Sequence, residues 1–154
     1  MDDTILTKVK KYNQLFKELD QLYHQYAKDS GLSDTMFWLM YSILEHEVPY
    51  TQKELCDFWF YSRQTVNSAL KSLEKRQLIQ LIPFSDNRKN KQILLTPSGK
   101  ELATKIIMPL MKAEENAFSE LGEENFDEFF RLTHRHIALL RVEIEKVEKM
   151  SSTD

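Results

Sequence analysis

Apolar residues recur near the start of the chain in alternating steps of four and three. They are Ile5, Val9, Tyr12, Phe16, Leu19, Tyr23 and Tyr26. Because an α-helix turns once every 3.6 residues, this spacing places them in one stripe along a single helix. Gly31 predicts the end of that helix. A second helical pattern begins after the candidate N-cap Ser33 and is stopped by Pro49.

A helix whose apolar residues also recur in steps of four and three is predicted after Gly122. The apolar stripe of this helix is Phe126, Phe130, Thr133, Ile137, Leu140, Ile144 and Val147. Residues 150–154 are expected to fray. A small helical unit between two such long stripes cannot easily cover both. The pattern therefore favours a second copy of the chain as the partner, and the alternative is a pair of helices packed within one chain.

Two short helices are predicted in the middle of the chain. Thr51 and Glu54 have the spacing of a capping box, which predicts a helix that contains Leu55, Cys56 and Trp59. Ser62 is a candidate N-cap for a helix over residues 62–76. The inward stripe of that helix is Val66, Ala69, Leu70 and Leu73.

The pattern then becomes β-like. Residues 79–82 and 92–95 are short β-prone runs, and the segment between them is rich in turn residues and then basic. They predict a two-stranded hairpin. A long helix is predicted to begin with Pro97 in its first turn and to run to about residue 121, with Pro109 as a kink.

The composition is that of one globular domain, with 154 residues, 42% apolar and 29% charged. Three glycines leave no glycine-rich phosphate loop, and the single cysteine, Cys56, permits neither a disulfide nor a cysteine-rich zinc site. No apolar run approaches the roughly 20 residues of a membrane helix, and the acidic start is unlike a signal peptide. We therefore expect a cytoplasmic protein without membrane contact, and the sequence predicts no catalytic residues, metal or cofactor.

The net charge of −3 at first argues against nucleic acid, but the charge is unevenly distributed. Residues 51–100 carry nine basic and four acidic side chains, a net +5, and the two ends together carry −8. Imbalances of this size also occur on solvated surfaces. The charge count therefore leaves a polyanion site and a solvated surface equally open.

Two short helices joined by a tight turn and followed by a basic hairpin indicate a winged helix-turn-helix. The spacing agrees, because Leu55 and the small Cys56 stand eleven and ten residues before the inward Val66.

The residues expected to contact DNA from the second helix are Ser62, Arg63, Gln64, Thr65, Asn67, Ser68, Lys71 and Lys75. Amides suit adenine, arginine suits guanine, and lysine or serine suits phosphate. No acidic residue stands between Arg63 and Ser72, whereas solvated helix faces usually mix signs.

The hairpin, residues 83–92, supplies further candidates for DNA contact. Arg88, Lys89 and Lys91 lie at or near its tip and are suited to a minor groove, where the negative potential favours arginine. Asp86 is expected to hold the tip in shape by hydrogen bonding. A merely solvated loop is the alternative.

Three parts of the chain match the pattern of a known family. The first runs from Glu54 to Cys56 through Ser62 to Asn67 with Leu70 and Leu73, the second is Leu78-Ile79, and the third is Leu95 to Gly99. They resemble the MarR family of bacterial transcriptional regulators, and the order of elements fits over essentially the whole chain. The resemblance implies a homodimer that binds a pseudo-palindromic operator, usually as a repressor released by a small ligand or a chemical signal. It also implies one MarR-like domain over residues 1–154, with dimerisation helices at 1–30 and 100–150 and a winged part at 33–98.

Three departures from the family pattern bear on the site. Phe60 and Gln77 stand where the family commonly has glycine, and a left-handed backbone is costly for phenylalanine, so we expect a wider or differently bent turn at Phe60. Asp86 and Arg88 match the aspartate and arginine of the family's wing, but Thr96 then comes one residue late. Alignment from Thr96 instead places Lys89 at the position of the family's wing arginine. Of the two residues, we prefer Arg88 as the one that reaches the groove.

The sequence thus predicts a mainly α protein, a winged helix-turn-helix with a two-stranded β-wing flanked by N- and C-terminal dimerisation helices. The predicted function is sequence-specific regulation of transcription on double-stranded DNA. The alternative is a winged-helix protein-interaction module that does not bind DNA specifically, and Phe60 is its best support. The aromatic residues at 37–38 and 58–61 are either core or the wall of an effector pocket.

Overall fold

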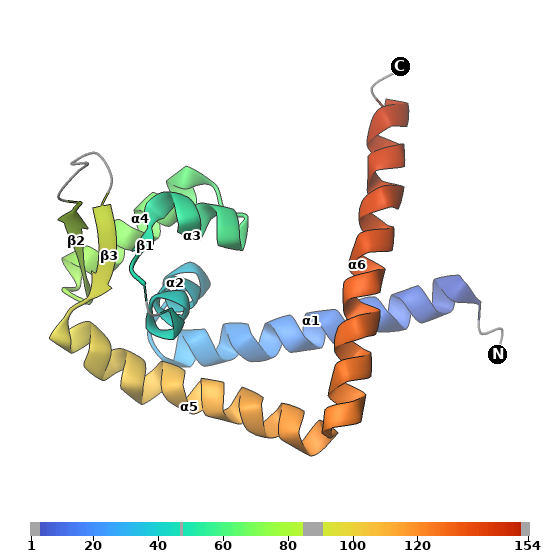
Figure 1. Cartoon of the computed structure of the whole chain (residues 1–154), viewed down its shortest axis with the longest axis horizontal. Helices are drawn as coiled ribbons and strands as arrows, with labels where there is room; N and C mark the ends of the chain where they lie inside the picture. The colour runs from blue at the N-terminus through green and yellow to red at the C-terminus, as the bar shows by residue number, and fades with distance from the viewer. Residues whose placement is uncertain (1–3, 47, 85–90, 152–154) are drawn as a thin grey trace. The chain divides into compact units, whose positions relative to one another are not determined.

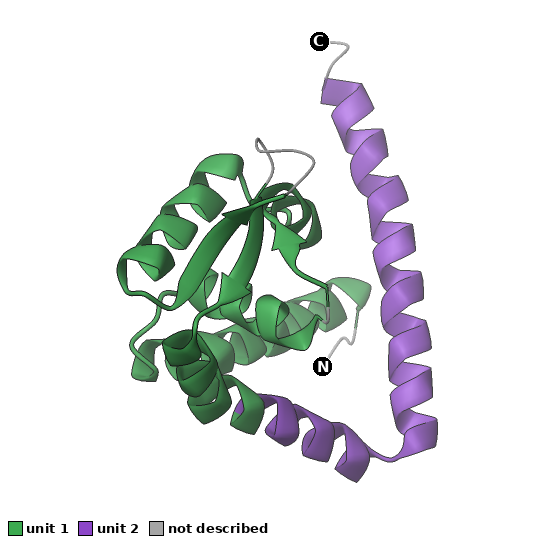
Figure 2. Ribbon diagram, turned by 60° about the vertical axis from the view of Figure 1, so that its left-hand side comes forward, with its two compact units in different colours: residues 1–109 green, residues 110–154 purple. Residues whose placement is uncertain are grey.

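The computed structural model describes residues 4–46, 48–84 and 91–151 (Figure 1). The helices and strands of these residues are α1 (Ile5–Asp29), α2 (Asp34–Glu45), β1 (Tyr50–Thr51), α3 (Gln52–Trp59), α4 (Arg63–Lys75), β2 (Ile79–Pro83), β3 (Lys91–Leu95), α5 (Pro97–Leu121) and α6 (Glu123–Ser151). Their contacts divide the chain into two compact units, Met1–Pro109 and Leu110–Asp154, which Figure 2 shows in different colours.

The short helices begin at the N-caps that the sequence predicts. The Ser33 side chain accepts a hydrogen bond from the Met36 amide at the start of α2, and the Ser62 side chain accepts one from the Thr65 amide at the start of α4. Thr51 caps α3 in the same way. Each cap satisfies a backbone donor that the first turn of a helix leaves without a partner, so the starts of these helices are well determined by local chemistry.

The core of the first unit lies between α2, α3, α4 and the sheet. All four predicted inward residues of α4 are buried, together with Leu55 of α3 and Ile93 of β3. The largest buried side chains of α2 are Phe37, Leu39 and Met40. Burial of this stripe fixes the rotation of α4 about its own axis and leaves its polar side facing away from the core.

The sheet has three strands, so the prediction of a two-stranded hairpin was incomplete. The additional strand β1 pairs antiparallel with β3, with Tyr50 opposite Ile93 and Thr51 opposite Gln92, and the strand order is β1-β3-β2. Two residues are too short to show a period of two, and the sequence assigns Thr51 to a helix cap. Thr51 both ends the strand and caps α3, which joins the start of that helix to the wing.

Phe60 and Gln77 both adopt the left-handed backbone conformation, with φ of 54° and 57°. The expectation that phenylalanine would avoid this conformation at the turn was wrong. Each residue ends a helix, and the next amide closes that end, from Tyr61 to the Cys56 carbonyl at 3.2 Å and from Leu78 to the Leu73 carbonyl at 3.0 Å. The conformation costs a non-glycine residue about 1–2 kcal/mol, which the packing of the two helix ends must offset.

The start of α5 lies against the end of the α4 segment. The Thr96 hydroxyl donates to the Gln77 carbonyl at 2.6 Å and accepts from the Gly99 amide at 3.0 Å, and the Thr96 amide donates to the Leu78 carbonyl at 3.1 Å. A Cβ atom on Gly99 would lie 1.8 Å from the Leu78 carbonyl oxygen. Glycine is therefore required here by close backbone approach, which gives a physical reason for the Thr-Pro-Ser-Gly sequence.

The C-terminal unit, Leu110–Asp154, holds the end of α5 and all of α6. α6 runs to Ser151, so the prediction that the chain frays from residue 150 was wrong for the first two residues of that tail. The structure describes every residue of α6, and none of them is buried. Among the described residues, no helix is both long enough and apolar enough to cross a membrane.

We predict that Gly99→Ala lowers the free energy of unfolding by about 2–3 kcal/mol, because the added methyl group must displace the backbone at Leu78. Urea denaturation followed by circular dichroism measures this loss. Ser98→Ala, a change at the exposed neighbouring residue, serves as the control and is expected to stay within about 0.5 kcal/mol of the unchanged protein. Equal stability of Gly99→Ala and the unchanged protein would contradict the close approach.

Candidate nucleic-acid interface

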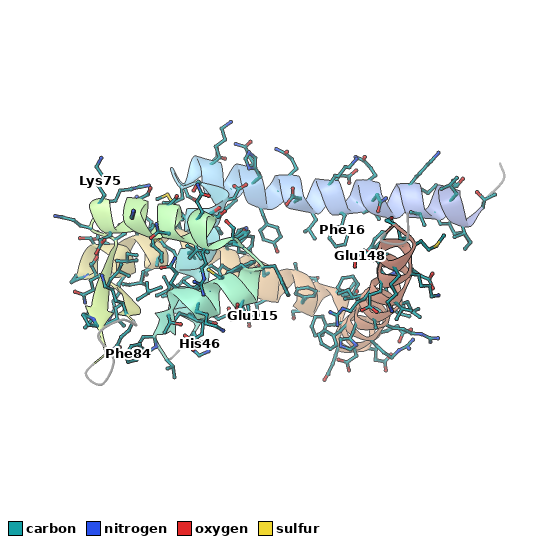
Figure 3. The ribbon with its side chains drawn as sticks, turned by 90° about the horizontal axis from the view of Figure 1, so that it is seen from above. Phe16, His46, Lys75, Phe84, Glu115 and Glu148 are labelled. Atoms are coloured by element: carbon teal, nitrogen blue, oxygen red, sulfur yellow. The ribbon has the colours of Figure 1, made fainter. Side chains whose placement is uncertain are left out.

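The polar side of α4 is fully available for contact. All eight residues predicted to contact DNA from this helix and its cap are exposed, whereas the inward stripe is buried. Lys75 lies near the end of the helix in Figure 3. The Ser62 and Thr65 hydroxyls are 2.8 Å apart and hold the first turn, so these two residues also have a structural role.

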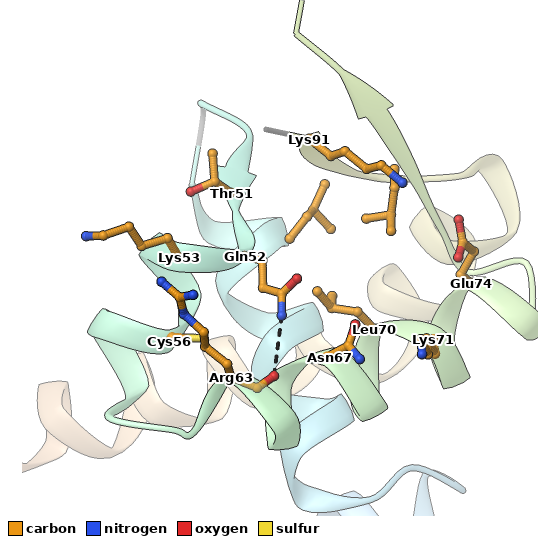
Figure 4. A pocket seen from close by; sticks show the side chains of 12 residues that line it. Thr51, Gln52, Lys53, Cys56, Arg63, Asn67, Leu70, Lys71, Glu74 and Lys91 are labelled. Carbon is orange, nitrogen blue, oxygen red and sulfur yellow. Dashed lines mark hydrogen bonds between the residues drawn. The ribbon is translucent and has the colours of Figure 1, made fainter. Parts of the chain in front are cut away.

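A hollow of about 550 Å³ lies between α3, α4 and the two longer strands (Figure 4). The α4 residues that line it include Arg63, Asn67 and Lys71, which recur in steps of four and so share one side of the helix. Gln64, Ser68 and Lys75, by the same periodicity, lie farther round the helix from the hollow. The predicted contact residues therefore divide into a group that lines the hollow and a group that faces outward.

Gln52 and Lys53 at the start of α3 also line the hollow, and the sequence analysis did not select them. The Gln52 side-chain amide donates to the Arg63 carbonyl at 3.4 Å, which links the starts of α3 and α4 (Figure 4). Lys53 pairs with Asp57 at 2.7 Å, and this carboxylate raises the pKa of Lys53. The capping box at Thr51 was the signal that could have identified both residues, because it places them in the first turn of a helix.

The capping box fixes the start of α3 at the edge of the hollow. The Thr51 amide donates to Glu54 Oε2 at 2.7 Å, and the Glu54 amide donates back to the Thr51 hydroxyl at 3.3 Å. The hydrogen bonds from the backbone and side chain of Thr51 stabilise the charged carboxylate and lower the pKa of Glu54. A helix start held in this way presents its free backbone amides in a constant direction.

The charge of the hollow is mainly positive. Its lining includes four cations, and Glu74 is an acidic residue among them. Lys91, at the start of β3, is an exposed member of this lining and belongs to the wing. Asp86, Arg88 and Lys89, the other predicted wing contacts, lie outside the described residues. The geometry thus brings cations of α3, α4 and the wing to one hollow.

Known proteins share both sequence and fold with this chain. The model of the MarR family matches residues 30–89. The HTH-type transcriptional regulator SarZ of Staphylococcus epidermidis is 27% identical over 113 residues, which are 73% of this chain and 68% of that protein. Over residues 30–89 the chain is therefore similar to the MarR family. This family match and this relative point to regulation of transcription rather than to an enzyme.

Solved structures extend the similarity to the MarR-family fold beyond the matched residues. AbsC, a MarR family transcriptional regulator from Streptomyces coelicolor, has a TM-score of 0.76 at 16% identity and covers 92% of this chain and 97% of its own. NMB1585, a MarR family regulator from Neisseria meningitidis, gives 0.75 at 19%, covering 90% and 97%. The complex of S. aureus MepR with DNA gives 0.70 at 19%, covering 84% and 96%. These likenesses confirm the predicted mainly helical winged fold.

A line of aromatic rings crosses the first unit from α1 to the turn before α4. Tyr23 lies 5.0 Å from Trp38, Trp38 lies 5.1 Å from Trp59, and Trp59 lies 6.2 Å from Tyr61, all between ring centroids. The Trp59 indole donates to the buried Ser42 hydroxyl at 2.8 Å. All four rings are half-buried, so they pack against one another at the edge of the core and both interpretations of the aromatic residues stay open.

Three further candidate features of the chain can be placed in the described residues. Within residues 4–46, 48–84 and 91–151, no three His, Cys, Asp or Glu side chains gather in a way that could hold a metal ion. Cys56 of α3 is buried, as the small position ten residues before Val66 predicts. His24 lies 2.9 Å from Asp34 and joins α1 to the start of α2.

We predict that the stability advantage of the unchanged protein over Glu54→Gln is lost at low pH. The folded-state pKa of Glu54 lies below its ordinary value of 4.5, so its contribution is fully present above that value and disappears as the pH falls through the lowered pKa. Thermal melts of both proteins at about pH 7 and about pH 3 measure this difference. Glu101→Gln, on the exposed side of α5, is the control for the loss of a carboxylate. If the melting temperatures of the unchanged protein and Glu54→Gln differ by the same amount at both pH values, the capping box is contradicted.

Proposed function

We propose that this protein is a transcriptional regulator of the MarR family, a homodimeric repressor that binds a pseudo-palindromic operator in double-stranded DNA and is released by a small ligand or a chemical signal. The observation that carries the proposal is the exposed polar side of α4, which has no carboxylate between Arg63 and Ser72. It stands next to a hollow whose lining is mainly cationic. A surface of this charge and shape suits the major groove of a duplex.

Each side chain of α4 has a role in this proposal that follows from its chemistry. Gln64 and Asn67 can form paired hydrogen bonds with adenine, and Arg63 can do so with guanine. Lys71, Lys75 and the small hydroxyls of Ser62, Thr65 and Ser68 suit phosphate oxygens. The N-terminus of α4 adds its partial positive charge for a backbone phosphate.

The wing completes the proposed interface in the minor groove. Lys91 supports this role because it is exposed and lies on the same hollow as Arg63 and Lys71. We include Arg88, Lys89 and Asp86 on the strength of the sequence, with Arg88 preferred as the residue that reaches the groove. Arginine is favoured there because a narrow minor groove concentrates negative potential.

Apolar exposure along the terminal helices supports a second copy of the chain as the partner. Large hydrophobic side chains stay exposed on α1, such as Phe16 (Figure 3), and along α6, such as Phe130, Leu140 and Ile144. An exposed apolar surface of this length is rarely tolerated by a monomer. This exposure supports the proposed assignment of residues 1–30 and 100–150 to dimerisation. A two-fold dimer would place its recognition helices about one DNA turn, roughly 34–36 Å, apart.

Release by a ligand is supported by the aromatic line between α1 and the turn before α4. A molecule that displaced Tyr23 or Trp38 would disturb Trp59, which is hydrogen-bonded to Ser42 and stacked near Tyr61. Tyr61 directly precedes the cap of α4. A change at Tyr23, the α1 end of the row of aromatic rings, can therefore alter the position and orientation of α4.

We predict that Asn67→Ala changes sequence preference and that Arg88→Ala weakens binding to all duplexes and flattens the dependence of affinity on salt. A base contact carries specificity, whereas a phosphate or groove cation releases counterions. Binding-site selection from random duplex DNA measures the first effect, and a salt series on the selected duplex measures the second.

The matched control for the loss of a cation is Arg135→Ala on α6, which should leave the salt slope unchanged. Unchanged selection by Asn67→Ala together with unchanged affinity of Arg88→Ala would contradict the proposed interface.

A second candidate function is a protein-interaction module that keeps the winged fold. The exposed aromatic residues Phe58 and Phe60 favour it, since large exposed rings often mark a protein contact. A gel shift on the protein's own upstream DNA across the salt series separates the two functions. The interaction module would give no specific complex at any salt concentration.

We predict that Leu140→Asp converts the protein to a monomer and lowers its affinity for the selected duplex by at least about tenfold. A carboxylate in the apolar stripe of α6 would be buried without a partner in the dimer, and a monomer contacts one half-site only. Analytical ultracentrifugation measures the mass, and fluorescence anisotropy measures the affinity. Arg135→Asp, on the opposite side of α6, is the control, and a dimeric Leu140→Asp protein would rule out this face.

A further inference from the structure

The side chain of Phe60 contributes little to the packing of the fold, and its left-handed backbone conformation is unfavourable for a non-glycine residue. Its side chain is 94% exposed, the largest exposed fraction among the large hydrophobic residues that the structure describes. Its φ of 54° lies in the region that glycine adopts without strain. A glycine would complete the turn equally well, so the packing of the chain gives no reason for a phenylalanine at this position.

The position of Phe60 is next to the proposed DNA-binding side chains. Gln52 and Cys56 line the hollow from α3, and residue 60 continues the same four-residue spacing at the end of that helix. Ser62, the cap of α4, follows two residues later, and Arg63, which lines the hollow, follows three residues later. Phe60 therefore stands where α3 ends and the recognition helix begins.

The two neighbours of Phe60 hold the turn in one conformation. Trp59 donates to Ser42 at 2.8 Å and lies nearly parallel to Tyr61, with 16° between the ring planes. The Tyr61 amide donates to the Cys56 carbonyl at 3.2 Å. Because both neighbours are fixed to the body of the domain, the backbone that carries the exposed ring is held in a constant place.

We propose that Phe60 is a DNA contact whose ring packs on the apolar surface of the duplex at the edge of the groove that α4 enters. This inference rests on the proposed function. The apolar surface available there is that of a deoxyribose or of a thymine methyl group. The cations Lys53, Arg63 and Lys71 on the adjoining hollow favour a polyanion over an ordinary protein surface as the partner.

The chain contains a matched control for this inference. Gln77 has nearly the same φ, 57°, and is also exposed. It follows the C-terminal end of α4, whereas Phe60 precedes the N-terminal end of that helix. Glycine at residue 77 or residue 60 relieves the same backbone cost. Thr96 bonds to the backbone carbonyl of Gln77, so Gln77→Gly retains that hydrogen bond. Only the change at residue 60 removes the proposed contact.

The experiment compares Phe60→Gly, Phe60→Asn and Gln77→Gly with the unchanged protein. The probes are a duplex recovered from a random pool by the unchanged protein and an unselected duplex of equal length. Neither glycine variant should melt below the unchanged protein, since each relieves strain. We expect Phe60→Gly and Phe60→Asn to weaken binding to the selected duplex by roughly fivefold or more, and Gln77→Gly to bind as the unchanged protein does.

Replacement of single thymines by deoxyuridine in the selected duplex identifies the surface that the ring contacts. If the ring packs on a methyl group, one replacement weakens the unchanged protein and leaves Phe60→Gly unaffected. If it packs on a deoxyribose, no replacement has this effect although Phe60→Gly still binds weakly.

Two results overturn the inference, and they are distinguishable. The first is full affinity of Phe60→Gly for both duplexes while the unchanged protein binds normally, which removes Phe60 from the interface and leaves the proposed function standing. A change in the sedimenting mass of the same variant would then assign the ring to a protein contact. Failure of the unchanged protein to select any duplex removes the proposed function and this contact together.

Discussion

Burial of one side of α4 is the constraint on which the rest of the winged part depends. Val66, Leu70 and Leu73 are almost completely buried, and a helix has no freedom to rotate once such a stripe is packed. The opposite polar residues are then directed away from the core. The buried side and the proposed contact side thus lie on opposite sides of the same thirteen residues, so the outward residues can vary while the fold is kept.

The helical framework could be predicted from the sequence because its signals are local. Ser33, Thr51 and Ser62 each act on the next turn of chain, and the stripe of α4 repeats with the helical period. β1 could not be predicted, because a two-residue strand exists only through its pairing with Ile93 and Gln92, more than forty residues away in the chain. Tertiary pairing of this kind has no periodic trace in the sequence.

The candidate site was predictable where it lies on one helix and less so where several elements meet. The eight α4 residues follow from helical spacing, but Gln52 and Lys53 join them only because α3 is anchored to the sheet at Thr51. Phe60 shows the opposite failure. A general rule about left-handed phenylalanine predicted a distorted turn, but Tyr61 and Trp59 are held firmly enough to impose the glycine conformation on it.

The contact between Trp38 and Trp59 has a spectroscopic consequence. They are the two tryptophans of the chain, their ring centroids are 5.1 Å apart, and they join α2 to α3. All of the tryptophan emission therefore arises from one place, beside the turn that leads into α4. The protein carries an intrinsic optical probe of that junction, and no extrinsic label is required to follow it.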